Sequence, residues 1–594
     1  MRSLSLSTFF TFTPLLYFAT AQAINGTVLN SDIDSFIANV LADWNSPAGL
    51  AVAVVRQDGQ GGWTVETKGY GNAKADGTKV TPDTLFSIGS ESKLFNILAT
   101  GLLISNESLS PPVTWTTKIA SIIPNWELMD PIASAGSAIM DLMSHRTGMP
   151  RHDLSIGSSQ TVPDLIDHMK YLKPSTEFRE TFQYNNLMYI TLSYLPTALL
   201  PSKPPFAQYV QENIFDSLGM NATTYSFARA NASGLLADGF ARTSAVTQNP
   251  INASALPIPF WFQAGGDEGN VASGPGGVIS SANDIVTWLK MLILGGINPA
   301  TNATFVPADV LETVVSGITV FPFTTDDYPE LSTSTYGGGQ YKSNYRGHDL
   351  IEHGGDIEGF HAMFTRFPFD GAAVAVLAND DLLYIRDIVR YRIIDELFGL
   401  EPVDWNTRFQ EVAVGTALGT AAAVSTPRSV NATPPTGGFA SLVGNYSNPG
   451  YTQFELCLIT PTPTNASDAC KELSHTFNAS FSARLTPGVP TFAWTWDRLG
   501  APYMQISHFD GDVFNLTGWT GIPTGNASSP LWAYDAGLAG TIVEFGVSNG
   551  TGAVGFGFEG GVWGEGVDVP DPQGQTAEER AEVWFEAVSG SRRR

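Results

Sequence analysis

The run Ser90-Glu91-Ser92-Lys93 places a nucleophile three residues before a base, and it is the only Ser-x-x-Lys in the sequence. On a helix, residues three apart share one face, so the Lys93 amine can reach the Ser90 hydroxyl. A lysine with its ordinary pKa of about 10.4 is protonated at neutral pH, so burial and neighbouring cations must lower this pKa before Lys93 accepts a proton. The spacing predicts a lysine-activated serine, with a simple helix-capping serine as the alternative.

The expected helix 90–104 begins at this serine. In a first helical turn, backbone N–H groups point toward any oxyanion beside the serine. The positive end of the helix also favours a neutral Lys93. The start of the expected helix and the Ser90–Lys93 pair therefore both predict a serine nucleophile that is activated by a neutral lysine.

A tyrosine followed two residues later by an asparagine supplies candidate partners. The pattern begins at Tyr70, Tyr184 and Tyr446. Tyr184 lies in the expected helical middle of the chain, just before the apolar run 187–192, whereas Tyr70 ends an expected strand and Tyr446 lies in the C-terminal region. Tyr184 and Asn186 are therefore the predicted partners of the serine.

The run Glu352-His353-Gly354-Gly355-Asp356 precedes the expected strand 360–367. Its glycines allow a substrate to approach the backbone closely. With its neighbouring histidines the run could suggest a metal, but it matches neither H-E-x-x-H nor H-x-H-x-D-H. No metal and no cofactor are expected.

A second serine signature, Gly546-Val547-Ser548-Asn549-Gly550, fits the G-x-S-x-G elbow of α/β-hydrolases. In those enzymes the acid and the histidine follow the serine in the chain. All eight histidines precede Ser548, so this elbow has no base. The prediction is a glycine-rich turn beside a glycosylation sequon.

Together these motifs resemble the superfamily of serine β-lactamases and penicillin-binding proteins, in the branch of class C β-lactamases, D-alanyl-D-alanine carboxypeptidases, D-aminopeptidases and related esterases. The resemblance covers roughly residues 30–400. It rests on Ser90-x-x-Lys93, Tyr184-x-Asn186 and His353-Gly354-Gly355 in family order, and is supported by Leu142-Met143-Ser144-His145-Arg146-Thr147-Gly148, Leu218-Gly219-Met220 and Gly276-Gly277. His145 and Arg146 are expected to brace a loop.

The resemblance implies that Ser90 attacks an ester or amide carbonyl and forms an acyl-enzyme. Lys93 would take the serine proton, and Tyr184 would relay a proton to the leaving group, its own pKa lowered by Lys93 and His353. The implied substrate and oxyanion residues are Asn186, His353, Gly355 and Asp356, with the N–H groups of Ser90 and Asp356 as the oxyanion hole.

No Lys-Thr-Gly exists in the sequence, and β-lactamases of this branch usually carry a lysine where His353 stands. The resemblance therefore implies an esterase or peptidase acting on a small-molecule or peptide substrate, ahead of a true β-lactamase. Two alternatives stay open: an acyltransferase of the same fold, and a catalytically inactive secreted binding protein.

The secondary-structure elements that must position these residues follow one another in an order that predicts the fold class. Strands are expected near both ends of residues 30–400, with helices between them. We therefore expect an α/β (α+β) fold in which one antiparallel sheet, flanked by helices, carries an inserted all-helical subdomain. The expected elements are helix 30–44, strands 51–56 and 63–70, helix 90–104, strands 360–367 and 372–377, and helix 383–398.

The predicted domain organisation has four parts. Residues 1–23 are a signal peptide, 24–404 the serine hydrolase domain, 405–440 an Ala-, Gly-, Thr- and Pro-rich linker, and 441–594 a β-rich domain. Short aromatic strands at regular spacing in the last part predict an all-β, barrel-like domain that resembles the lipocalin-like appendages of some family members.

Several features predict a secreted, extracellular glycoprotein. The apolar stretch in residues 1–23 is followed by small residues, as in a secretory signal, and is too short to span a membrane. In that setting the only two cysteines, Cys457 and Cys470, are expected to form a disulfide. Thirteen N-glycosylation sequons begin at Asn25, Asn106, Asn221, Asn231, Asn252, Asn302, Asn431, Asn445, Asn465, Asn478, Asn515, Asn526 and Asn549.

The composition excludes some classes of partner. There are 31 Lys plus Arg against 57 Asp plus Glu, giving a net charge of −26. Nucleic-acid binding needs a basic face, so it is not expected. Hydrophobic residues make up 43% of the 594 residues, enough to bury large cores, and no later segment is apolar and long enough for a membrane span.

Overall fold

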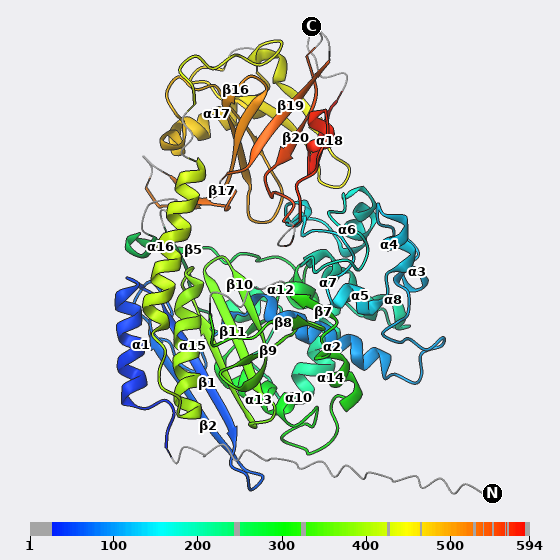
Figure 1. The fold of residues 1–594 in the computed structure, drawn as a ribbon, viewed down its shortest axis with the longest axis vertical. Coiled ribbons are helices and arrows are strands. Elements are labelled where there is room, and N and C mark those ends of the chain that lie inside the picture. The colour runs from blue at the N-terminus through cyan, green and yellow to red at the C-terminus, as the bar shows by residue number, and fades with distance from the viewer. Residues whose placement is uncertain are drawn as a thin grey trace, which may run out of the picture.

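The structure is a computed structural model that describes residues 26–242, 250–321, 328–424, 428–463, 466–526, 530–538, 540–548, 552–564, 566 and 569–588. The predicted signal peptide and three of the predicted glycosylation sites, Asn25, Asn465 and Asn549, lie outside these residues. Figure 1 shows two stacked bodies. We call residues 26–400 the sheet domain and residues 428–588 the barrel domain.

An antiparallel sheet forms the centre of the sheet domain, as predicted. Its eight strands, counted over the described residues, run in the order β2-β1-β12-β11-β10-β9-β8-β7. Leu50 pairs with Ala378 and Arg56 with Ala372, so strands from both ends of the domain lie side by side. The bounds are β1 Gly49–Gln57, β2 Trp63–Gly71, β7 Thr319–Phe321, β8 Ser334–Tyr336, β9 Tyr341–Tyr345, β10 His348–Ile357, β11 Phe360–Phe367 and β12 Ala372–Ala378.

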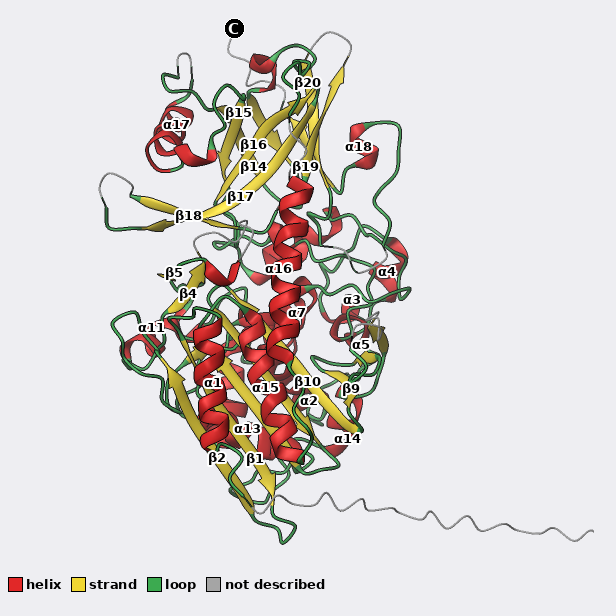
Figure 2. Cartoon of the chain, turned by 60° about the vertical axis from the view of Figure 1, so that its left-hand side comes forward, coloured by secondary structure: helices red, strands yellow, loops and turns green. Residues whose placement is uncertain are grey.

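Helices cover both faces of this sheet, which explains why β1 is apolar and buried over residues 49–55 rather than alternating. Ala51, Ala53 and Val55 face one core, and the residues between them face the other, because successive strand residues point to opposite sides. α1 (Ser31–Asp43) and α15 (Leu383–Phe398) cover one face (Figure 2). α2 (Ser92–Ile104) and α13 (Ala282–Ile293) contribute to the core on the other.

The inserted region is mainly helical, as predicted, with two short strand pairs. β3 (Phe86–Ser87) pairs with β6 (Ile279–Ser280), and β4 (Gly239–Arg242) with β5 (Ala255–Ile258). The helices are α3 Ile119–Ile122, α4 Pro131–Gly136, α5 Ile139–Met143, α6 Val162–His168, α7 Asn186–Ser193, α8 Leu195–Leu199, α9 Phe206–Val210, α10 Asp216–Leu218, α11 Phe227–Ala232, α12 Ser273–Gly276 and α14 Ala308–Val314.

The segment between the two domains begins with a long helix. α16 spans Trp405–Val424 and runs from the sheet domain toward the barrel (Figure 2). Its first residue, Trp405, is buried and stacks on Tyr391 with 4.4 Å between ring centroids. This stacking anchors the start of α16 to the sheet domain.

The C-terminal part is a closed barrel, which confirms the predicted all-β class. The described strands run β16-β15-β14-β13-β21-β20-β19-β17-β18, and β16 also pairs with β17, so eight strands close and β18 extends outward as a hairpin. The bounds are β13 Gly444–Ser447, β14 Gln453–Leu458, β15 Thr491–Thr495, β16 Tyr503–Asp510, β17 Val513–Pro523, β18 Leu531–Asp535, β19 Ile542–Ser548, β20 Gly552–Glu559 and β21 Val583–Ala587.

Two further sequence predictions concern the barrel. The disulfide is confirmed: Cys457 on β14 bonds to Cys470 on α17 (Asp468–Ser480). Ser548 of the Gly-x-Ser-x-Gly signature ends β19 and pairs with Gly552 on β20, so it sits at the end of a strand in an antiparallel hairpin. The next two residues of that signature lie outside the described ones.

Direct hydrogen bonds join the two domains. Trp496 Nε1 donates to the Leu154 carbonyl at 3.2 Å, and Leu499 N donates to the Ile156 carbonyl at 3.0 Å. Because both acceptors belong to the loop between α5 and α6, the barrel is fixed against the inserted region. In the part of the chain that is described, no helix combines the length and apolar character required to cross a membrane.

Candidate active site

Ser90 lies where two elements meet. A short 3-10 turn, Gly89–Glu91, leads directly into α2, whose residue Lys93 follows one turn later. The Ser90 side chain is partly exposed, whereas that of Lys93 is fully buried. No side-chain capping bond is formed at the start of α2, so Ser90 does not serve as its cap. Its hydroxyl interacts with Lys93 and Tyr184 instead.

The Lys93 amine is surrounded by neutral acceptors. Its Nζ lies 3.1 Å from Ser90 Oγ, 2.8 Å from Asn186 Oδ1 and 3.0 Å from the Pro275 carbonyl. Burial first, and the charge of Arg151 second, hold the pKa of Lys93 well below its ordinary value. A neutral amine donates two N–H bonds, so bonds to Asn186 and Pro275 leave its lone pair directed at Ser90.

Tyr184 completes the group at the serine. Its hydroxyl donates to Ser90 Oγ at 2.8 Å. The residue immediately precedes α7, where Asn185 caps the helix by accepting from Met188 N. His145 braces this segment, because its Nδ1 accepts from Asn185 N at 3.0 Å and its ring lies 4.4 Å from that of Tyr184.

The expected lowering of the Tyr184 pKa is wrong. Burial raises the pKa of this phenol well above its ordinary value, and the charge of Arg151 offsets only part of that. A buried Lys93 that is itself neutral provides no charge to stabilise a phenolate. Tyr184 is therefore a protonated hydrogen-bond donor at neutral pH.

His353 is also neutral. It lies inside β10, with Nδ1 2.6 Å from the Gly354 carbonyl and Nε2 3.1 Å from Tyr336 Oη. An N–H at Nδ1 satisfies the carbonyl, which leaves Nε2 to accept from Tyr336. Burial lowers the pKa of His353 to about 3. His353 therefore contributes no positive charge beside Tyr184, contrary to expectation.

The backbone of β10 runs tightly against the serine. A Cβ at Gly355 would lie 1.8 Å from the Ile88 carbonyl oxygen and 3.1 Å from Ser90 N, so only glycine fits. The next residue, Asp356, pairs with Arg386 and accepts from His361, both at 2.7 Å. Burial raises the pKa of Asp356, but these two partners outweigh it and hold the pKa well below its ordinary value. Arg386 and His361 therefore compensate the negative charge of Asp356 beside Ser90.

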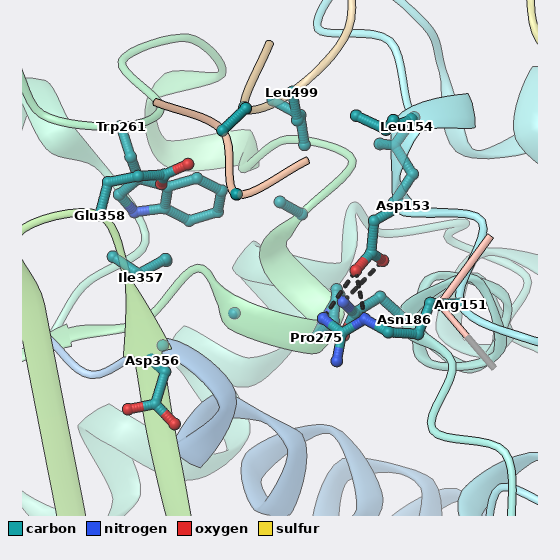
Figure 3. Close-up of a pocket in the computed structure, with 18 of the residues that line it drawn as sticks. Arg151, Asp153, Leu154, Asn186, Trp261, Pro275, Asp356, Ile357, Glu358 and Leu499 are labelled. Atoms are coloured by element: carbon teal, nitrogen blue, oxygen red, sulfur yellow. Dashed lines mark hydrogen bonds and ion pairs between the residues drawn. The ribbon is translucent and has the colours of Figure 1, made fainter. Parts of the chain in front are cut away.

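Sequence reasoning missed Arg151 and Asp153. The Arg151 guanidinium lies 5.0 Å from the centre of the Tyr184 ring and 2.6 Å from Asp153 Oδ2. Asp153 Oδ1 in turn accepts from Asn186 Nδ2 at 2.9 Å (Figure 3). Asn186 is thus held between Asp153 and Lys93. The loop sequence carried no chemical motif that would have marked either charge.

Arg146 braces the structure, as expected. Its Nε donates to Asp141 Oδ1 at 2.7 Å, and Arg179 donates to the same carboxylate. Asp141 is fully buried, so the two arginines compensate its charge. This ion pair fixes the loop that carries His145.

Two cavities meet at Ser90. One, of about 560 Å³, lies between the sheet domain and the barrel and is lined by Trp261, Ile357, Leu499 and Val562 among others (Figure 3). The other, of about 620 Å³, extends toward β9 and α16 and includes Tyr341. Ser90, Arg151 and Asp356 line both. The serine can therefore contact a compound that occupies both cavities.

A helix-flanked antiparallel sheet with a helical insertion, and with a Ser-x-x-Lys pair packed against its strand β10, defines a protein of the β-lactamase fold. Residues 38–396 match the Beta-lactamase family, and the chain belongs to this family of serine hydrolases.

Curated relatives cover most of the chain. It is 30% identical over 448 residues to the Unguisins hydrolase ungD' of Aspergillus campestris, covering 73% of this chain and 78% of the relative. It is also 30% identical over 462 residues to the Unguisins hydrolase ungD of Aspergillus violaceofuscus, with 73% and 77% covered.

A solved structure shares the overall fold. The octameric penicillin-binding protein homologue from Pyrococcus abyssi is 16% identical, with a TM-score of 0.51. The match covers 89% of this chain and 97% of that chain. The similarity in fold thus extends beyond the sheet domain.

Proposed function

We propose that this protein is a secreted serine hydrolase that cleaves an ester or amide through an acyl-enzyme on Ser90. The observation that carries the proposal is the buried Lys93 amine, 3.1 Å from Ser90 Oγ and bonded otherwise to Asn186 and Pro275. A serine hydroxyl needs such a base to act as a nucleophile near neutral pH.

In the first step, Ser90 Oγ forms a bond to the substrate carbonyl carbon while its proton passes to Lys93. The N–H groups of Ser90 and Asp356 stabilise the resulting oxyanion, each donor contributing about 3 kcal/mol to transition-state stabilisation. Gly355 permits this arrangement because it brings the β10 backbone against the serine.

In the second step, the bond between the carbonyl carbon and the leaving group breaks. Tyr184 gives its proton to the leaving oxygen or nitrogen as the tetrahedral intermediate collapses. The protonated Lys93 amine, which lies 4.7 Å from the centre of the Tyr184 ring, then returns a proton directly to the Tyr184 oxygen, because the esterified Ser90 Oγ has no proton to relay. Water then attacks the acyl-enzyme by the reverse relay and releases the acid. Tyr184 acts throughout as a neutral donor, in accordance with its raised pKa.

Asn186, His353 and Asp356 have supporting roles in this scheme. Asn186 orients Lys93, and the remaining face of its amide contacts the cavity. His353 provides no cation, which favours ester or peptide substrates over β-lactams. The names of the two fungal relatives, both of them unguisins hydrolases, also favour hydrolysis over acyl transfer.

Turnover of p-nitrophenyl esters and amino-acid p-nitroanilides by the wild type and Ser90→Ala tests this proposal. We expect product release by the wild type alone, at a rate unaffected by added amine or alcohol. Formation of an amide or ester with the added acceptor in place of the acid would identify an acyltransferase. Equal turnover by both proteins would refute the role of Ser90.

Secretion and N-glycosylation form a separate part of the proposal. It is supported by the signal sequence 1–23 and by the surface position of the described sequon asparagines, none of which is buried. Expression of the full chain in a eukaryotic cell should deliver a protein to the medium whose mass falls on treatment with peptide N-glycosidase. Retention in the cell with no change in mass would contradict it. The exposed asparagines are Asn221, Asn231, Asn252, Asn302, Asn431, Asn515 and Asn526, and the partly exposed ones are Asn106, Asn445 and Asn478.

A further inference from the structure

The cavity between the domains has walls from both. Here we call this cavity of about 560 Å³ the chamber. Figure 3 shows apolar side chains of its lining, such as Trp261 and Leu499, together with charged ones, such as Arg151 and Glu358. Its apolar side chains include Leu154, Trp261 and Ile357 from the sheet domain, and Leu499, Leu538 and Val562 from the barrel.

The charges nearest the serine in the chamber are paired. Arg151 pairs with Asp153, and Asp356 pairs with Arg386. The chamber is also lined by Glu358, Asp381 and Asp535. Asp535 pairs with Arg484 and Asp381 accepts from Tyr534, while burial raises the pKa of both Glu358 and Asp381 and so favours their uncharged forms. An anionic or cationic substrate group placed there would have to compete with these partners. An apolar group meets no such competition and gains about 25 cal/mol for each Å² of surface removed from water.

We propose that the chamber binds a bulky, uncharged apolar group of the substrate, and that the barrel selects substrates by supplying one wall of it. The chemical class is an ester or amide with a large aliphatic or aromatic group beside the reacting carbonyl. A volume of this size accepts far more than an acetyl group. This proposal rests on the proposed Ser90 acyl-enzyme.

A series of p-nitrophenyl esters, from acetate to phenylacetate and longer aliphatic acyl groups, tests the selectivity. For the wild type we expect kcat/KM to increase with the size of the apolar group, by about tenfold for each 1.4 kcal/mol of added transition-state binding. Leu538→Trp fills the chamber from the barrel side and should abolish the preference while acetate hydrolysis persists. Val554→Trp adds the same bulk at a barrel position that is 47% exposed and outside the chamber lining, and should keep the preference.

Leu499→Ser provides a second variant that makes the barrel wall polar without adding volume. It too should reduce the preference for bulky esters. An unchanged ratio of bulky to acetyl esters in both variants, or an equal fall for every ester, would overturn the chamber proposal. Continued hydrolysis of acetate would then show that the Ser90 mechanism still stands, so the two failures are distinguishable.

A second inference rests on different contacts. A loop of the barrel, residues 562–564, pairs with the backbone beside the serine. Arg151 N donates to the Gly564 carbonyl at 3.1 Å, and His152 N donates to the Trp563 carbonyl at 2.8 Å. Gly564 has a φ of +68°, and a Cβ there would lie 2.8 Å from Arg151 Cδ. The barrel therefore constrains both the backbone and the side chain of Arg151.

Arg151 connects this barrel loop to Lys93. Its guanidinium lies over the Tyr184 ring and pairs with Asp153. Asp153 accepts a hydrogen bond from the Asn186 amide, and the Asn186 carbonyl oxygen accepts one from Lys93. We infer that Arg151 is a positioning residue for the Ser90 centre and that the barrel holds it in place. In this arrangement the barrel contributes to catalysis as well as to substrate choice.

The charges around Lys93 determine the expected pH effect. Tyr184, Tyr189, His145 and His353 face the Lys93 region as neutral groups, while Arg151 and Asp153 are the nearest charges. Arg151 lowers the pKa of Lys93, and Asp153 raises it. Loss of the Arg151 charge would leave Asp153 unpaired, so both effects raise the Lys93 pKa. The acidic limb of the pH–rate profile should then move to higher pH.

Arg151→Gln tests the inference, with Arg151→Lys as the variant that keeps the charge. We expect the acidic limb of kcat to move up by about one pH unit in Arg151→Gln and to stay nearer its original position in Arg151→Lys. A loss of kcat without movement of the limb would indicate a purely structural role and overturn the inference.

Gly564→Ala tests the contribution of the barrel without changing any charge. The new Cβ should displace Arg151 and produce the same upward movement of the limb. Gly511→Ala is the matched control, because Gly511 has a φ of +55° and an added Cβ would meet nothing within 4 Å, so this variant carries similar backbone strain without the contact. Identical pH profiles for the two variants would contradict the assigned role of the loop.

Discussion

Lys93 Nζ lies 3.1 Å from Ser90 Oγ, and the fully buried amine forms an ion pair with none of the described carboxylates. A buried lysine with no opposite charge is costly in its charged form, which favours the neutral amine. The same burial that lowers the stability contributed by this residue thus prepares it as a base. This relationship leads to the predictions that follow.

Replacement of Lys93 by methionine should separate activity from stability. Lys93→Met should lower kcat/KM for a nitrophenyl ester by about 10²–10⁴-fold, because the general base is lost. Since a buried polar amine is replaced by an apolar chain of similar length, the melting temperature should stay level or rise. Lys290→Met, at a partly exposed lysine of α13, is the control and should retain activity. Full activity in Lys93→Met would refute the role of the base.

The pH dependence of the free energy of unfolding should also reveal the lowered pKa of Lys93. Its pKa is lower in the folded than in the unfolded chain, so unfolding takes up a proton at pH values between the two. The free energy of unfolding contributed by Lys93 therefore rises with pH through that window. Urea unfolding at several pH values should show a smaller rise in Lys93→Met than in the wild type. Identical slopes would mean that the Lys93 pKa is not lowered.

Nitrocefin should be a poor substrate. His353 is neutral, with a pKa lowered by burial to about 3, and so presents no cation at the place where β-lactamases of the resembled branch carry lysine. Measured kcat/KM should be larger for apolar esters than for nitrocefin at neutral pH. If nitrocefin proved the better substrate, the specificity inferred from His353 would be wrong.

Gly355→Ala should strongly reduce the catalytic activity of the protein. A Cβ at this position would overlap the Ile88 carbonyl, so β10 or the turn that carries Ser90 must shift, at a cost of about 1–3 kcal/mol. Activity should fall more than stability because the oxyanion site is displaced. Gly415→Ala on α16 is the control: nothing lies within 4 Å of its Cβ, so activity should be unchanged. Wild-type activity in Gly355→Ala would contradict the assigned site.

Much of the fold could be predicted because local patterns and tertiary environment agree. The apolar strands expected near 51–56 and 360–377 form the sheet. α17 was missed because it is a single amphipathic helix in an otherwise strand-rich, Gly- and Pro-punctuated region. The disulfide to β14 explains its position there.

The candidate site was predictable only where a motif marked it. Ser90, Lys93 and Tyr184 converge as their spacing suggested. Arg151 lay in a loop without a motif, and its importance depends on a barrel residue more than 400 positions later, Gly564. The Tyr184 pKa was wrongly predicted because sequence reveals nearby charges but not the depth of burial, which dominates here. Long-range contacts and desolvation are therefore what the sequence could not supply.

The most direct test of the central claim is intact-mass analysis after treatment with a fluorophosphonate probe. The wild type should gain one probe mass, located by peptide mapping at Ser90, and Ser90→Ala should gain none. Lys93→Met should react far more slowly, because the serine is no longer activated. Equal labelling of the wild type and Ser90→Ala, or labelling mapped to another serine, would contradict Ser90 as the nucleophile.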